Sequence, residues 1–272
     1  MSPAQRRWPI VTTALFFAVQ GAMGVLGQHQ VWAQILDIHQ ECVDTGCFDG
    51  DSPGFPVQIA TSGSYRLVSN LQVADGFTSG IVASAPDVTL DLNGFGIFGP
   101  AVCHGTPVTH CDYTGSGTGV SVGERSVVAN GTIRGMGGTG LASDEFSRLE
   151  SLIISGNGGT GVAGYHSSMR NSSILGNGAA GVQATSGGGR FEIEGSIVSG
   201  NATEGLNMSS GSVFNCRIFE NKGAGLRSFS GGGDAVYSGN VIRDNNQQTP
   251  AVQVQGGIAL GCNVIGNAAV CP

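Results

Sequence analysis

The sequence predicts an all-β, single-domain solenoid in which short strands stack coil upon coil. Three observations lead to this prediction. Glycine accounts for 47 of the 272 residues, and only 11% of the residues are charged, against about 25% in an average protein. A Gly-(Val/Leu) marker recurs every 20–24 residues, and an asparagine marker recurs at similar intervals. Short β-branched segments such as LIIS (152–155) and SIVS (196–199) lie between the markers.

The same composition excludes several other classes of protein. With 40% hydrophobic residues and so little charge, the chain is neither a coiled coil nor a charge-rich disordered protein. Collagen is excluded because the glycines do not fall at every third position. The net charge of −7 would repel a phosphate backbone. We therefore expect no nucleic-acid partner.

Residues 1–33 have the plan of a secretory signal peptide. Arg6 and Arg7 precede an uncharged, mostly apolar stretch over 10–26, and Val31-Trp32-Ala33 fits cleavage before Gln34. An uncleaved membrane anchor is the alternative, and the Arg-Arg pair also fits a twin-arginine signal. The interpretation as a signal peptide predicts a secreted or periplasmic protein with no membrane association after cleavage.

The two markers define the coil. The glycines of the first marker are Gly119, Gly140, Gly161, Gly181, Gly205 and Gly225, and the asparagines of the second are Asn157, Asn177, Asn201, Asn221, Asn245 and Asn267. We expect the asparagines to occupy turns with left-handed φ and to bond the backbone of the neighbouring coil. Stacking would also build one internal apolar stripe from Ile154, Ile174, Val198, Ile218, Ile242 and Val264.

The part of the chain before these repeats is less regular but has the same character. Strands are expected around residues 57–59, 65–68, 80–82 and 88–94, where β-branched and aromatic residues alternate with polar ones. Residues 100–117 are rich in Gly, Thr and Pro and are expected to form a loop inserted into the solenoid. Since no linker divides residues 34–272, we expect one domain.

Six of the seven cysteines form pairs at short spacing, which an oxidising compartment permits to become disulfides. The expected pairs are Cys42–Cys47, Cys103–Cys111 and Cys262–Cys271. Cys216 falls where other repeats carry small residues, so it is expected to be a buried free thiol. Cys103-His104 and His110-Cys111 could instead hold zinc, but a disulfide beside two solvated histidines is the favoured interpretation.

Four stretches resemble a known family: CFDGDSPGFPV (47–57), GSYRL (63–67), VTLDLNG (88–94) and the C-terminal 261–272. They are similar to a group of bacterial secreted right-handed parallel β-helix proteins, and the resemblance covers most of the chain after residue 33. It implies a right-handed parallel β-helix over 34–272. The wider superfamily includes pectate lyases, alginate epimerases, rhamnogalacturonan-cleaving enzymes and phage tailspikes, so a carbohydrate ligand is implied by analogy of fold.

A candidate site follows from aligning the coils on their Gly-(Val/Leu) marker, because residues at equal offsets stack. The fourth residue after the Val or Leu is Glu124, Glu145 and His166 in three successive coils. With the neighbouring positions, the catalytic candidates are Glu124, Glu145, Tyr165 and His166, and the binding candidates are Arg125 and Asp144. Uronate lyases and epimerases need a proton-transferring base and a cationic partner for the sugar carboxylate. The alternative is a solvated turn with ordinary polar residues.

Two function classes follow from these residues. The first is a secreted, non-catalytic β-helix that binds an extracellular or cell-surface polysaccharide and needs no cofactor. The second is a polysaccharide lyase or epimerase acting on an anionic uronate polymer, in which Glu124 and Glu145 could also hold Ca²⁺. A further column of Glu150, Arg170 and Glu194 alternates in sign from coil to coil and predicts a ladder of ion pairs on an outward strand face.

Overall fold

The computed structural model describes residues 34–185, 189–229, 234–247 and 251–272. The expected signal peptide, residues 1–33, lies outside this range. The described chain is almost entirely β-structure, and its α-helix is the single turn α1 (Gln40–Val43). Among these residues no helix is long and apolar enough to cross a membrane.

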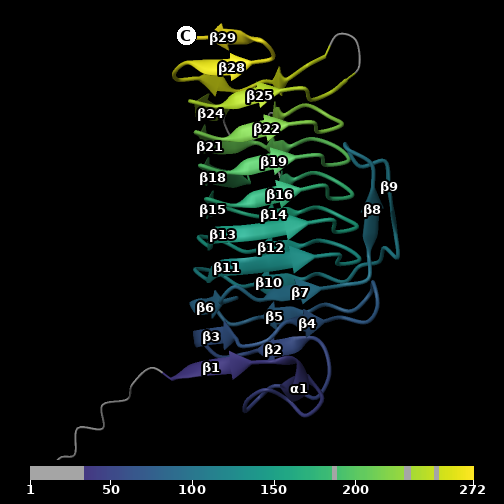
Figure 1. Ribbon diagram of the computed structural model, residues 1–272. Helices are drawn as coiled ribbons and strands as arrows, with labels where there is room; N and C mark the ends of the chain where they lie inside the picture. Colours follow the sequence, from purple (N-terminus) through teal and green to yellow (C-terminus); the bar gives the residue numbers. More distant parts are fainter. Residues whose placement is uncertain (1–33, 186–188, 230–233, 248–250) are drawn as a thin grey trace, which may run out of the picture. The chain divides into compact units, whose positions relative to one another are not determined.

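Residues 34–272 form a parallel β-solenoid, which confirms the predicted fold class (Figure 1). Each coil contributes one strand to a nine-stranded sheet, which we call the inner-marker sheet because its strands follow the Gly-(Val/Leu) markers. Its strands are, in order, β2 (Val57–Ile59), β5 (Ile81–Ala83), β10 (Val120–Val122), β12 (Leu141–Ser143), β14 (Val162–Gly164), β17 (Val182–Ala184), β20 (Leu206–Met208), β23 (Leu226–Ser228) and β26 (Val254–Gln255).

The remaining strands of the coils form two strips, which join into one large sheet because β11 (Val127–Arg134) and β13 (Arg148–Ser155) run through both. Strip one also holds β1 (Ile35–Ile38), β3 (Gly63–Leu67), β6 (Val88–Asp91), β15 (Ser167–Arg170), β18 (Arg190–Glu194), β21 (Ser210–Phe214), β24 (Ala235–Ser238) and β27 (Ile258–Ala259). Strip two also holds β4 (Leu71–Gln72), β7 (Gly96–Phe98), β16 (Ser173–Leu175), β19 (Ile197–Ser199), β22 (Arg217–Phe219), β25 (Val241–Arg243) and β28 (Asn263–Ile265).

The expected apolar stripe lies on the inner side of strip two. The register stacks Ile133, Ile154, Ile174, Val198, Ile218 and Ile242, all of them fully buried. The prediction was wrong for Val264, which is 39% exposed. Ile265 takes the place opposite Ile242, because the register of β25 and β28 pairs Val264 with Val241.

The asparagine column forms a buried ladder of amides that runs through the turns between strip two and the inner-marker sheet. The Oδ1 of Asn201, for example, accepts the backbone N–H and the Nδ2–H of Asn177, each at 3.0 Å. The same pair of bonds links the other neighbours from Asn157 to Asn245. Gln253 ends the ladder by accepting from Asn245 at 2.9 Å. Asn267, which the spacing had included, is exposed and lies outside it.

The left-handed backbone of these turns belongs to the residue before each asparagine, which corrects the expectation that the asparagines themselves adopt it. Gly156, Gly176 and Gly200 have φ of 61°, 58° and 70°, and the equivalent Glu220 and Asp244 have φ of 54° and 57°. Glycine suits this conformation because it has no Cβ to clash. Two coils therefore carry a strained residue where the others carry glycine.

All three expected disulfides are present, and Cys216 is the buried free thiol. Cys216 lies in a second polar column, which also contains Ser172, Ser196, Asn240 and Asn263 and whose side chains accept backbone N–H groups of the preceding coil. Burial raises the pKa of the Cys216 thiol to about 11. Structural disulfides are typical of proteins that fold outside the cytoplasm.

The insertion at 100–117 is more ordered than the expected loop. It contains an antiparallel hairpin of β8 (Val102–His104) and β9 (His110–Asp112), which lies along the outside of later coils (Figure 1). The backbone N–H of Val108, at its tip, donates to the carbonyl of Gly200 at 2.8 Å. A second antiparallel pair, β28 with β29 (Ala268–Val270), ends the described solenoid.

Candidate functional site

The sequence-predicted site residues lie in the turns that connect the inner-marker sheet to strip one. Two residues before strip one, four successive coils place a residue with left-handed backbone: Asp87, Arg125, Phe146 and His166, with φ of 56°, 55°, 59° and 50°. We call this set the turn column. Glu124, Glu145 and Tyr165 immediately precede its last three members and form a column of their own.

This arrangement differs by one residue from the alignment made on the sequence. The spacing had put His166 in line with Glu124 and Glu145, whereas the structure puts Tyr165 there. The reason is a change of offset within one turn: Leu141 pairs with Val162, 21 residues on, but Arg148 pairs with Ser168, only 20 residues on. His166 therefore stacks next to Phe146.

Arg125 is engaged by two carboxylates. Its Nε and Nη2 bond Asp87 Oδ1 and Oδ2 at 2.9 and 3.0 Å, and its Nη1 bonds Glu124 Oε2 at 2.9 Å. The hydrogen bonds with Asp87, followed by its charge, raise the pKa of Arg125, and the guanidinium lowers the pKa of the Asp87 carboxyl. Because this fork is bidentate, the geometry favours the carboxylate already bound. Arg125 and Glu124 thus neutralise each other.

The other two acidic candidates lie in the next coil. Asp144 is exposed, and its Oδ1 accepts the backbone N–H of Glu145 at 2.9 Å. This bond fixes the local turn. Within the described chain, neither Glu124 nor Glu145 belongs to a group of three or more His, Cys, Asp or Glu side chains close enough to share a cation.

Aromatic rings gather beside these carboxylates. Tyr165 and His166 stack with their ring centroids 4.0 Å apart and their planes at 25°. The Phe146 ring lies 6.2 Å from His166 in the preceding coil. Phe146 is 65% exposed, so its ring faces solvent instead of the core.

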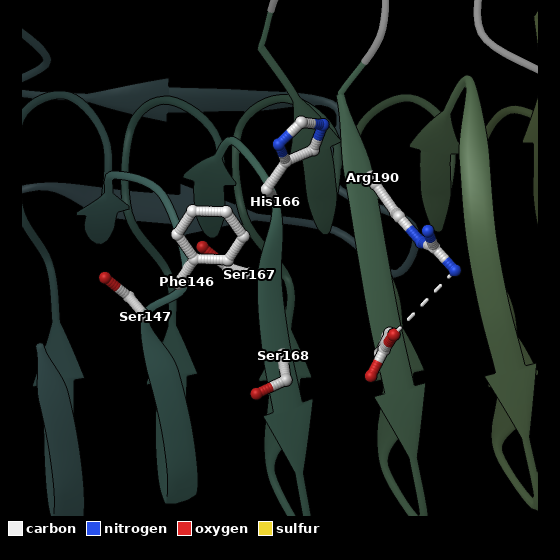
Figure 2. A pocket seen from close by; sticks show the side chains of 7 residues that line it. Phe146, Ser147, His166, Ser167, Ser168 and Arg190 are labelled. Atoms are coloured by element: carbon white, nitrogen blue, oxygen red, sulfur yellow. Dashed lines mark ion pairs between the residues drawn. The ribbon is translucent and has the colours of Figure 1, made fainter. Parts of the chain in front are cut away.

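A groove of about 490 Å³ opens next to these rings, along the outer face of strip one (Figure 2). It crosses the starts of β13, β15 and β18. Phe146 and His166 form its aromatic side, and Ser168, Arg190 and Glu192 supply polar groups. Arg190 Nη2 and Glu192 Oε1 are 4.0 Å apart, and their side chains are 61% and 56% exposed. Both charged groups can therefore reach a ligand in the groove.

The predicted ladder of alternating charge lies further along the same outer face. Its register is confirmed, since Glu150 pairs with Arg170 and Arg170 with Glu194. Arg170 Nε and Glu194 Oε2 form an ion pair at 3.6 Å. Glu150 instead approaches Arg148 on its own strand, at 3.7 Å. These exposed pairs contribute little to stability, about 0–1 kcal/mol each.

With this geometry in view, comparison with known proteins gives one decisive match. The profile of the family described as "Right handed beta helix region" matches residues 57–213 and 118–271. The chain belongs to the right-handed β-helix family. This result confirms the expected handedness, and the parallel register described above is that of a β-helix.

Among solved structures, this β-helix is similar to the A-module of the mannuronan C-5 epimerase AlgE4 of Azotobacter vinelandii. The two sequences are 17% identical, the match covers 82% of this chain and 70% of that chain, and the TM-score is 0.46. No protein of curated function matches the sequence. No residue role follows from a likeness of this size.

Sequence reasoning missed three members of the β-helix site. Asp87 precedes Arg125 by 38 residues because the insertion separates them, so the repeat interval of 20–24 residues does not connect the two. Phe146 was passed over because an apolar residue is expected to be buried. Arg190 follows residues 186–188, where the alignment of coils lost its register. The consecutive signal of an aromatic residue next to a charged turn, at 145–146 and again at 165–166, was the available hint.

Proposed function

We propose that this protein is an extracytoplasmic β-helix that binds a glycan, without catalysis, in the groove on strip one. The observation that carries the proposal is Phe146. A non-glycine residue in left-handed conformation costs about 1–2 kcal/mol, and Phe146 has φ of 59° while its ring is 65% exposed. Neither backbone preference nor core packing favours a phenylalanine there. Strain that persists without a structural return points to function.

The residues around Phe146 suit a sugar. Pyranose rings have an apolar face that packs on aromatic side chains, and their hydroxyls need a few well-placed hydrogen-bonding partners. Phe146 and His166 supply the aromatic surface, while Ser168, Arg190 and Glu192 supply donors and acceptors. Strands stack about 4.8 Å apart, so a groove across three coils spans about 10 Å, the length of one or two sugar rings.

Binding is favoured over lyase or epimerase chemistry by the state of Arg125. A uronate enzyme at this face needs a cation that neutralises the sugar carboxylate. Arg125 is held by Asp87 and Glu124 at 2.9–3.0 Å, so freeing it would leave two carboxylates unpaired. Arg190 is the cation that lines the groove, and it lies on the strand next to Ser168 and His166.

The test is a glycan array probed with the protein beginning at Gln34, followed by titration of the glycans that bind. Phe146→Ala should weaken binding about tenfold or more, which corresponds to about 1.4 kcal/mol. Tyr113→Ala is the matched control, because Tyr113 is also exposed, at 72%, and left-handed, with φ of 54°, but does not line the groove. Binding that is unchanged in Phe146→Ala, or absent from the array altogether, would contradict the proposal.

The enzyme alternative is tested with the same protein on alginate, pectate and related uronate polymers. We expect no turnover. Turnover that disappears in His166→Ala and Tyr165→Phe, while both variants keep the circular dichroism spectrum of the wild type, would establish a catalytic site at this face and overturn the non-catalytic part of the proposal.

A further inference from the structure

The hairpin of β8 and β9 presents different side chains on its two faces. Its register pairs Cys103 with Cys111 and His104 with His110, and places Asp112 opposite Val102. The disulfide side faces the coils: Cys103 Sγ lies 3.4 Å from the carbonyl oxygen of Asn157. Because side chains alternate along a strand, His104, His110 and Asp112 share the opposite, outer face, where all three are exposed.

We propose that His104, His110 and Asp112 bind a zinc ion. Their potential ligand atoms all lie within 4.8 Å of one another. The two imidazoles are stacked, with centroids 4.7 Å apart and planes at 17°, and His104 Nε2 is 3.0 Å from Asp112 Oδ2. Zinc sites use such ligands at about 2.0–2.2 Å in tetrahedral geometry, and small side-chain rotations from this arrangement bring three donors to that distance.

The donor set favours zinc over other common ions. Two imidazoles and one carboxylate suit a late transition metal, whereas Ca²⁺ takes six to eight oxygen ligands. The cysteines are not ligands, because Cys103 and Cys111 are joined to each other. This site therefore differs from the Cys/His set that the sequence suggests. Three protein ligands leave a fourth position for water or for a group from outside the chain.

The hairpin also holds the ligands in place. The Cys103–Cys111 disulfide fixes the register of the two strands directly beside the histidines. Thr109 Oγ1 lies 3.2 Å from His110 Nδ1, which orients the ring and leaves Nε2 for the metal. An outer hydrogen bond of this kind accompanies most zinc-binding histidines. An exposed His104–Asp112 ion pair alone would explain neither the position of His110 nor this orientation.

The test is isothermal titration calorimetry with zinc chloride on oxidised protein that carries no polyhistidine tag and has been treated with a chelator. We expect saturable binding of one zinc ion per chain, and no binding heat with calcium chloride. His110→Ala and Asp112→Asn should each reduce the zinc affinity at least tenfold. His166→Ala is the matched control, because it removes an imidazole from the strip-one groove and should leave the zinc affinity unchanged.

The proposal is overturned if the wild type binds no stoichiometric zinc, if His110→Ala binds as tightly as the wild type, or if His166→Ala abolishes binding. Circular dichroism of each variant and a thiol assay showing one free cysteine keep misfolding from passing as loss of the site. Zinc binding that survives Phe146→Ala separates this site from the proposed glycan groove, so each proposal stands or falls on its own.

Discussion

The buried asparagine ladder should carry a large share of the stability of the β-helix, and Asn201→Ala is the sharpest test of this. The substitution removes the Oδ1 that accepts both the backbone N–H and the Nδ2–H of Asn177 at 3.0 Å. Both groups are buried, so no water replaces the lost acceptor. The Oδ1 of Asn221 keeps the backbone N–H of residue 201, at 3.1 Å, and is not left unpaired.

The magnitude follows from the two orphaned donors. A buried polar group without a partner costs about 1–3 kcal/mol, so Asn201→Ala should lower the free energy of unfolding by about 2–5 kcal/mol. Asn201→Asp should be no better, because a carboxylate cannot donate to Asn221 Oδ1, where the amide now bonds at 2.8 Å. Asn267→Ala is the matched control, since Asn267 occupies the same place in the sequence repeat but is exposed.

The assay is equilibrium urea unfolding followed by circular dichroism and by fluorescence, whose agreement tests whether a single transition is measured. Asn201→Ala should move the midpoint to clearly lower urea, and Asn267→Ala should leave it within about 0.5 kcal/mol of the wild type. A small effect for Asn201→Ala, or an equal loss in both variants, would refute the reasoning that the ladder, and not the repeated amide as such, stabilises the fold.

Two further predictions concern the turns and the free thiol. Glu220→Gly should raise the free energy of unfolding by about 0.5–1 kcal/mol, because it relieves the left-handed φ of 54° at the place where Gly200 stands one coil earlier; urea unfolding measures this, and a loss of stability would contradict it. Burial raises the pKa of Cys216 from 9.0 to about 11, so the thiol of the unfolded chain ionises first as the pH rises. The stability owed to the neutral buried thiol is therefore complete below pH 9.0 and is lost between pH 9.0 and about 11. Unfolding midpoints of the wild type should fall more steeply across this range than those of Cys216→Ser, and parallel pH profiles would exclude the effect.

Much of the solenoid could be predicted because its physics is periodic. Each Gly-(Val/Leu) marker begins a strand of the inner-marker sheet, since a Cβ at the glycine would collide with the neighbouring coil: at Gly181 it would lie 2.5 Å from Val198 Cγ1 and 2.7 Å from the carbonyl of Gly205. The asparagines were recognised for the same reason, because one buried amide dictates the next. The last coil escaped prediction because β28 pairs with an antiparallel partner, which ends the repeat and leaves Val264 and Asn267 outside it.

The candidate site could be predicted only in part because it lies in turns, where one residue more or less changes which side chains stack. The missing residue between the coils of Glu145 and Tyr165 moved His166 from the carboxylates to Phe146. Asp112 was overlooked for a different reason. Its proximity to His104 depends on the register of an antiparallel hairpin, and neither the spacing of the cysteines nor the coil interval contains that information.

The hairpin of β8 and β9 changes how this β-helix should fold and unfold. In a simple stack each coil contacts only its neighbours, so the ends open one coil at a time. Here the hairpin leaves the chain before β10 and bonds the turn at Gly200, several coils later. Opening from the C-terminal end can proceed coil by coil only as far as Gly200, and beyond it the hairpin must detach as well. Coils between β10 and Gly200 therefore form one cooperative unit, which completes late in folding because its closing contact is distant in sequence.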